Sequence, residues 1–161
     1  MAKSNNLPSP VCLFDSDVLI NWLTKEEDPL THEKLWEAPL AILRLVEKGN
    51  IKGFASLLGI MEIRFVLRRK KDLKESVVQE HMDEIIKLID VIIPDEVNLL
   101  QANNLQSELP FSPMDAVITA VGLSMRDRHV VLLTRDKTLS RLGSLYLPIQ
   151  TPEEFLLNIP K

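Results

Sequence analysis

Four acidic residues, far apart in the chain, stand where an α/β fold would bring their side chains together. They are Asp15, Glu62, Asp115 and Asp136. Asp15 directly follows the apolar run of residues 11–14, and Asp136 closely follows another at 130–134. Carboxylates crowded at the ends of parallel strands repel each other, so such a cluster persists mainly when a divalent cation or shared protons neutralise it. The residue types therefore point to a site that binds a divalent cation or shares protons.

Glu62 lies inside the apolar stretch 57–67, in a segment that we expect to be helical. On a helical wheel it lies about 160–200° from Arg64 and Lys71, so its side chain points toward the packed side. A carboxylate on that side takes up a proton, a cation or a metal ion. The alternative is a Glu at the edge of the core that pairs with Arg69, one heptad away.

Each aspartate also has a structural interpretation that stays open. Ser112 and Pro113 begin a helix with Asp115 at its third position, which is typical of a capping box. Capping and catalysis are compatible there, because a helix N-terminus holds a carboxylate ionised and oriented. Asp15, Asp17 and Asp136 also suit turns or helix N-caps, although the position of Asp15 at the end of a buried strand favours a functional role.

Strand and helix patterns alternate along the chain, which positions these residues. We expect strands at 11–14, 51–55, 91–93, 130–134 and 146–149. We expect helices at 17–23, 31–48, 75–89, 95–106, 113–125 and 137–142, one from the N-cap Ser56 to about residue 71, and one that begins with a capping box at Thr151. This order predicts an α/β protein, with a mostly parallel central sheet in a three-layer α/β/α arrangement. Ligands of such folds bind outside the carboxyl ends of the strands.

Composition restricts the class of protein. A chain of 161 residues suits a single domain over 1–161, with an N-terminal lead over 1–10 that we expect to be flexible. No apolar run reaches the roughly 18–20 residues that span a membrane, and the N-terminus lacks a signal-peptide core. The lone Cys12 fits a reducing cytoplasm. With a net charge of −4, nucleic-acid binding would depend on local basic patches. The absence of a Gly-rich phosphate loop argues against dinucleotide chemistry.

Five stretches together resemble the PIN domain, a fold of metal-dependent nucleases, and within it the VapC-type ribonuclease toxins. They are residues 13–20, 56–62, 112–118, 133–137 and 151–156. The resemblance implies that the four acidic residues form the family's acidic quartet and that Thr134 is its supporting hydroxyl. Asp17 departs from the family, where Asn is common at this position. The extra carboxylate either tightens metal binding or supplies a supporting hydrogen bond.

The resemblance also implies an activity. We expect a metal-dependent endoribonuclease in which Asp15, Asp115, Asp136 and Glu62 hold one or two Mg²⁺ or Mn²⁺ ions. Phosphodiester hydrolysis would leave a 5′-phosphate and a 3′-hydroxyl. Basic residues near the cleft are expected to contact RNA phosphates, among them Arg69, Arg135 and Lys137. If the protein is a toxin, its partners are a small antitoxin and a second copy of the chain, joined through the early helices.

Three alternatives remain. The first is a housekeeping RNA-processing nuclease. The second is a non-catalytic PIN-like module that binds RNA or an assembly, against which the intact quartet argues. The third is a phosphoacceptor receiver domain, which also gathers aspartates at the edge of a sheet but has no role for Glu62.

Overall fold

A single parallel sheet runs through the described part of the chain. The structure, a computed structural model, describes residues 10–159. Its five strands are β1 (Val11–Phe14), β2 (Lys52–Ser56), β3 (Asp90–Ile92), β4 (Val130–Leu133) and β5 (Ile149–Gln150). The strand order is β3-β2-β1-β4-β5, and all of these neighbours pair in parallel. Of the expected N-terminal lead, residues 1–9 lie outside the described residues.

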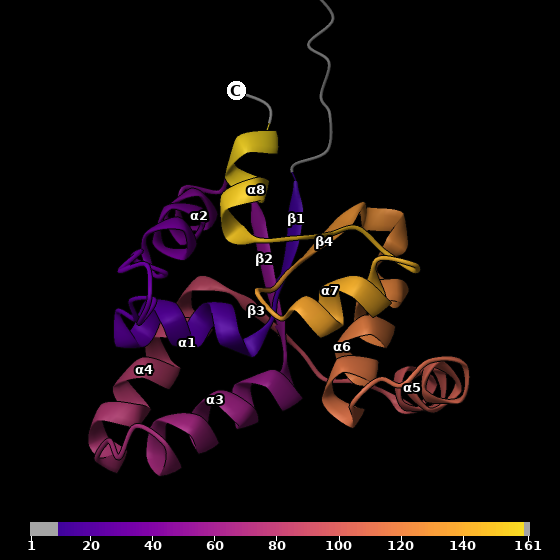
Figure 1. The fold of residues 1–161 in the computed structure, drawn as a ribbon, viewed down its shortest axis with the longest axis horizontal. Coiled ribbons are helices and arrows are strands. Elements are labelled where there is room, and N and C mark those ends of the chain that lie inside the picture. The colour runs from indigo at the N-terminus through magenta and orange to yellow at the C-terminus, as the bar shows by residue number, and fades with distance from the viewer. Residues whose placement is uncertain (1–9, 160–161) are drawn as a thin grey trace, which may run out of the picture.

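Helices cover both faces of this sheet, which confirms the expected three-layer arrangement (Figure 1). One face carries α1 (Ser16–Thr24), α2 (Glu37–Glu47), α3 (Leu57–Arg69), α4 (Glu75–Leu88) and α8 (Pro152–Asn158). The other carries α5 (Glu96–Glu108), α6 (Pro113–Ser124) and α7 (Lys137–Gly143). Among residues 10–159, no helix has the length and apolar character needed to cross a bilayer.

The central strand β1 is buried on both faces. Cys12 and Phe14 pack in the layer beneath α1–α4, whereas Val11 and Leu13 pack in the layer beneath α5–α7. A strand covered on both sides is apolar throughout, as the run of residues 11–14 suggested. The first polar residue after it, Asp15, therefore marks the point where the chain leaves the core.

Local hydrogen bonds explain where the observed elements differ from those expected. The helix expected over 31–48 begins only at Glu37, because Asp28 accepts hydrogen bonds from the backbone of Leu30 and Thr31 and holds a turn there. The strand expected over 146–149 is confined to β5, since the preceding backbone turns back onto the carbonyl of Gly143. Ser56 sits at the N-cap of α3 but makes no capping hydrogen bond with its side chain.

Candidate active site

The carboxyl ends of β1 and β4 bring Asp15 and Thr134 together. In the sheet Phe14 lies opposite Leu133, so the residues that follow the two strands emerge side by side. The Thr134 hydroxyl donates a hydrogen bond of 2.7 Å to Oδ2 of Asp15, and the Ser16 backbone N–H donates one of 2.8 Å to Oδ1. Asp15 is thus also the N-cap of α1, so the capping interpretation holds alongside its place in the acidic cluster.

The carboxylate of Asp17, the second residue of α1, has a hydrogen-bond partner for only one of its two oxygens. Its Oδ2 accepts a 2.8 Å hydrogen bond from the backbone N–H of Arg135, while its buried Oδ1 finds no partner among residues 10–159. Burial raises the pKa of Asp17 to about 6. Burial, together with the charge of Asp17, raises the pKa of Asp15 to about 8. In both residues burial disfavours the charged form of the carboxyl group.

Asp115 enters from α6 on the other side of the sheet. The Ser112 hydroxyl caps that helix by accepting a 3.2 Å hydrogen bond from the Asp115 backbone, as the sequence predicted. Burial raises the pKa of Asp115, and the negative charges of Asp136 and Glu62 raise it further against the opposing hydrogen bond from Ser112. Asp115 also helps to raise the pKa of Asp15. Carboxylates from distant parts of the chain therefore lie close enough to repel one another.

Hydrogen bonds orient the remaining two carboxylates. Asp136 caps α7 by accepting backbone hydrogen bonds from Thr138 at 2.6 Å and Leu139 at 2.9 Å. Glu62 accepts a 2.6 Å hydrogen bond from the hydroxyl of Ser16, which ties α3 to the start of α1. In the described residues Glu62 makes no ion pair with Arg69, so the pairing considered from the sequence is absent.

The donor chemistry of this cluster suits a hard divalent cation. Carboxylate oxygens are the ligands that Mg²⁺ and Mn²⁺ prefer, and the partnerless Oδ1 of Asp17 is a buried oxygen that a cation would satisfy. Within residues 10–159, however, no three Asp, Glu, His or Cys side chains are already arranged to hold one ion together. The structure thus provides the oxygen donors but no completed coordination sphere.

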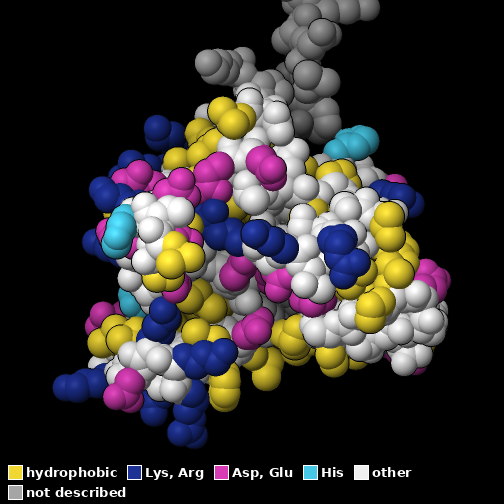
Figure 2. Space-filling view, in the orientation of Figure 1, with side chains coloured by type: hydrophobic (Ala, Val, Ile, Leu, Met, Phe, Trp, Pro, Cys, Tyr) yellow, Lys and Arg dark blue, Asp and Glu magenta, His cyan; other side chains and the backbone are white. Residues whose placement is uncertain are grey.

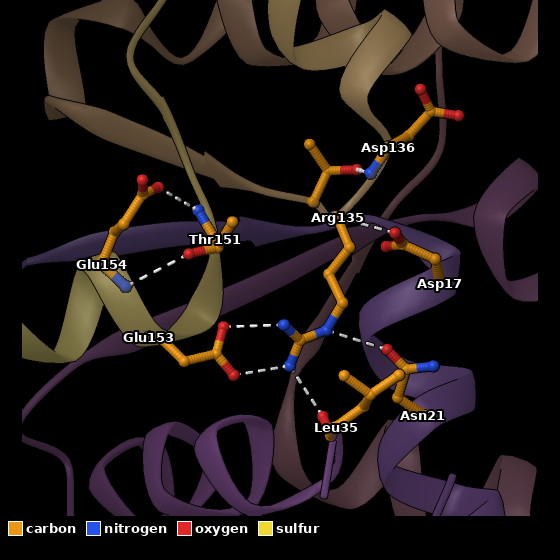
Figure 3. Close-up of polar contacts among 9 residues, drawn as sticks. Asp17, Asn21, Leu35, Arg135, Asp136, Thr151, Glu153 and Glu154 are labelled. Carbon is orange, nitrogen blue, oxygen red and sulfur yellow. Dashed lines mark hydrogen bonds and ion pairs between the residues drawn. The ribbon is translucent and has the colours of Figure 1, made fainter. Parts of the chain in front are cut away.

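The three basic residues singled out in the sequence differ in their surroundings. Figure 2 shows acidic side chains gathered across the middle of one face, with Lys and Arg side chains beside them. Lys137, next to Asp136, and Arg69, at the end of α3, are both exposed. The guanidinium of Arg135 instead donates to Asn21, Glu153 and the Leu35 carbonyl, which leaves little capacity for a phosphate (Figure 3).

Sequence reasoning missed three polar residues that surround the acidic side chains. Ser16 was passed over as part of a turn, although it stands between two of the acidic residues. Asn21 lies one helical turn after Asp17, a spacing that places both on one face of α1. Glu153 was given no role of its own beside the capping box of Thr151 and Glu154, but it binds Arg135. Only the spacing of Asn21 offered a signal in advance.

The family model of the PIN domain matches residues 12–145. The chain belongs to the PIN domain family. PIN domains are nucleases, which agrees with an acidic site at the carboxyl edge of the sheet, and the matched span contains all five carboxylates described above. A comparison with curated proteins gave no match.

Solved structures share the architecture of this PIN domain. A chain in the structure of VapBC2 from Rickettsia felis, bound to a DNA fragment from the promoter, has 14% identity and a TM-score of 0.67, with 88% of this chain and 98% of that chain covered. A chain in a toxin-antitoxin complex from Klebsiella pneumoniae has 16% identity and a TM-score of 0.60, with 88% of this chain and 97% of that chain covered. A chain in the structure of DNA-bound VapBC from Salmonella typhimurium has 14% identity and a TM-score of 0.61, with 89% of this chain and 98% of that chain covered. At these identities the likeness establishes the fold alone.

Proposed function

We propose that this PIN domain is a metal-dependent endoribonuclease and the toxin of a toxin-antitoxin pair. The observation that carries the proposal is the convergence of Asp15, Asp17, Glu62, Asp115 and Asp136, whose charges or burial leave three of the five with raised pKa values. Membership of a nuclease family supports hydrolysis of a phosphodiester. The cytoplasm is the compartment that we propose, because cellular RNA is met there.

Asp15, Asp115, Asp136 and Glu62 are the proposed holders of one or two Mg²⁺ or Mn²⁺ ions. When bound, such an ion lowers the pKa of a water molecule and offsets charge on the phosphate oxygens. Thr134 orients Asp15, and Ser16 orients Glu62, through the hydrogen bonds described above. Water is the proposed nucleophile, so no protein side chain forms a covalent bond with RNA. Its oxygen forms a new bond to phosphorus while the bond from phosphorus to the 3′ oxygen breaks, which leaves the 5′-phosphate and the 3′-hydroxyl that the resemblance to PIN nucleases implies.

RNA binding on a chain with a net charge of −4 needs local cations. We propose Lys137, the first residue of α7 beside Asp136, as the nearest phosphate contact. Arg69 is a more distant candidate on α3. Such contacts engage phosphates without reading the base sequence, so they give affinity rather than cleavage specificity.

The antitoxin partner is proposed from the similar complexes and from a groove between α3 and α4. This groove, of about 610 Å³, exposes Met61 and Phe65 by 58% each and Ile86 by 57%. Three arginines line it: Arg64, Arg68 and Arg69. Arg64 and Arg68 pair with Glu75, whereas Arg69 makes no ion pair in the described residues. An apolar groove with a basic rim fits an amphipathic antitoxin segment that carries acidic residues.

Co-purification tests this partner. The product of an antitoxin-sized open reading frame beside the gene should bind the wild-type chain and should lose affinity for Phe65→Asp. Ile93→Asp, which alters an apolar residue 72% exposed outside the groove, is the matched control and should still bind. Equal binding by Phe65→Asp would place the antitoxin elsewhere. The expected homodimer is tested separately, by sedimentation of the free chain over a range of concentrations.

Cleavage of a structured RNA tests the activity itself. We expect the purified chain to cut this RNA with Mn²⁺, and to be inactive with EDTA or after Asp115→Asn. Asp127→Asn, which changes an exposed aspartate in the turn before β4, should cut like the wild type. Cleavage that persists in chelator or in Asp115→Asn rejects the mechanism. RNA binding without any cleavage by the wild type would favour the non-catalytic module.

A further inference from the structure

The three residues that follow β4 hold the acidic site together through consecutive contacts. The hydroxyl of Thr134 donates to Asp15 and accepts from the backbone N–H of Asp136 at 3.0 Å. The backbone N–H of Arg135 donates to Asp17 at 2.8 Å. The position of this short loop therefore sets the position of three carboxylates at once.

The side chain of Arg135 anchors the same loop to elements remote in sequence (Figure 3). Its guanidinium binds both carboxylate oxygens of Glu153 on α8, each at 2.7 Å. It also donates to Oδ1 of Asn21 on α1 at 3.0 Å and to the carbonyl of Leu35 at 2.8 Å. We call Arg135, Glu153 and Asn21 the arginine clamp.

Within the clamp, the ion pair between Arg135 and Glu153 has the features of a strong ion pair rather than of a weak one on the protein surface. Bidentate pairs between an arginine and a carboxylate fix the geometry of both groups, and charge-assisted hydrogen bonds are stronger than neutral ones. The Arg135 side chain is only 18% exposed. Burial alone would raise the pKa of Glu153, but the hydrogen bonds and the charge of Arg135, together with hydrogen bonds from the Glu153 backbone and the Thr151 side chain, lower it overall.

We propose that Arg135 and Glu153 are positioning residues, through which α8 fixes the loop after β4 and thereby the placement of Asp17 and Asp136 toward a divalent cation. The inference rests on the proposed function, because it concerns the same metal site. Neither residue is expected to touch the ion. Their effect passes through the loop backbone, as for the outer partners that orient the ligands of other metal sites.

Direct measurement of Mn²⁺ binding to the metal-free protein tests the clamp without relying on activity. Free Mn²⁺ is measured by its electron paramagnetic resonance signal, and folding is followed by thermal unfolding in EDTA. Glu153→Gln and Arg135→Met should each weaken Mn²⁺ affinity about tenfold, the lower end of the effect known for such outer partners. The double variant should be little weaker than Arg135→Met alone, because that change already removes the ion pair with Glu153.

Glu154→Ala is the matched control on the adjacent residue. Glu154 accepts a 2.8 Å hydrogen bond from the backbone of Thr151 in the capping box of α8, so its loss destabilises the same helix without touching Arg135. We expect a lower melting temperature with Mn²⁺ affinity unchanged. Equal weakening by Glu154→Ala and Glu153→Gln would overturn the proposal, because a general loosening of α8 would then explain both.

Arg135→Lys keeps the positive charge and the backbone N–H but loses the two-pronged geometry. Its Mn²⁺ affinity should lie between those of the wild type and Arg135→Met. If Arg135→Met does not fold, Arg135→Lys takes its place in the test. If the wild type binds Mn²⁺ while the Glu153 and Arg135 variants bind equally well, the clamp proposal alone fails. If the wild type binds no Mn²⁺, the proposed function fails with it.

Discussion

Asp15 combines burial with two hydrogen bonds and a charged neighbour, so its protonation couples the site to the stability of the fold. In the unfolded chain its pKa returns to the ordinary value of 3.8, whereas in the folded protein it lies at about 8. The folded state therefore binds more protons between these values. The stability that Asp15 contributes is fully present below about pH 4 and is lost as the pH rises through about 8.

The metal-free protein should accordingly lose stability between mildly acidic and mildly alkaline pH. We expect urea unfolding in EDTA to give a free energy of unfolding about 4 kcal/mol lower near pH 8 than near pH 5, from Asp15 alone. Asp15→Asn removes the titrating group, so its stability should change less with pH than that of the wild type. Identical pH slopes for the two proteins would contradict the raised pKa of Asp15.

Asp17→Asn separates the two roles that the sequence left open. An asparagine can still accept the hydrogen bond from the Arg135 backbone through its amide oxygen, but it removes one negative charge from the cluster. We expect the metal-free stability to rise by about 1 kcal/mol because repulsion falls, and Mn²⁺ affinity to fall. Urea unfolding and calorimetric titration measure the two effects. Unchanged Mn²⁺ affinity would reduce Asp17 to a hydrogen-bonding role.

The sequence predicted the acidic residues but not the contacts that orient them. The ends of buried strands can be recognised in a single sequence as the ends of apolar runs, and so can the acidic residues that follow them. The bond between Ser16 and Glu62 joins residues 46 apart, and the ion pair between Arg135 and Glu153 joins residues 18 apart on different elements. Such pairings depend on how helices pack against the sheet, and no local pattern encodes them.

At the scale of elements, strands and helices followed from periodicity and from capping residues. Capping by Ser112 and Thr151 was visible because it depends on neighbouring residues only. The start of α2 was missed because the turn at Asp28 competes with helix formation over the residues before Glu37. The short β5 was misplaced because only pairing with β4, and not composition, defines it.

Two glycines offer a paired test of how tightly the elements pack. A Cβ at Gly53 in β2 would come within 2.8 Å of Ile89 and 3.0 Å of Phe14, whereas one at Gly59 in α3 would meet nothing within 4 Å. We expect Gly53→Ala to destabilise the protein by about 1–3 kcal/mol through overpacking. Gly59→Ala should stabilise it by about 0.5–1 kcal/mol through its helix propensity. Urea unfolding measures both, and equal effects would contradict the packing described.

At the scale of the whole molecule, the proposed metal site is built from acidic residues of separate segments. A ligand that binds only the folded protein stabilises it by about 2.7 kcal/mol at a concentration 100 times its dissociation constant. Mn²⁺ should therefore raise the melting temperature of the wild type well above its value in EDTA. Asp136→Asn should show a smaller rise, measured by thermal unfolding at matched ionic strength with Ca²⁺-free buffer. An equal rise in both proteins would show that Mn²⁺ stabilises the chain elsewhere.

The strand order places the first strand of the chain at the middle of the sheet, beside a strand formed more than a hundred residues later. Val11 lies opposite Val130, and the hydroxyl of Thr134 reaches Asp15 across a separation of 119 residues. During synthesis, β1 can pair with β2 early, but its other neighbour in the sheet is absent until β4 has been made. The acidic pocket therefore cannot be completed before residue 136 has been made, so the unfinished chain should lack the nuclease activity that we propose.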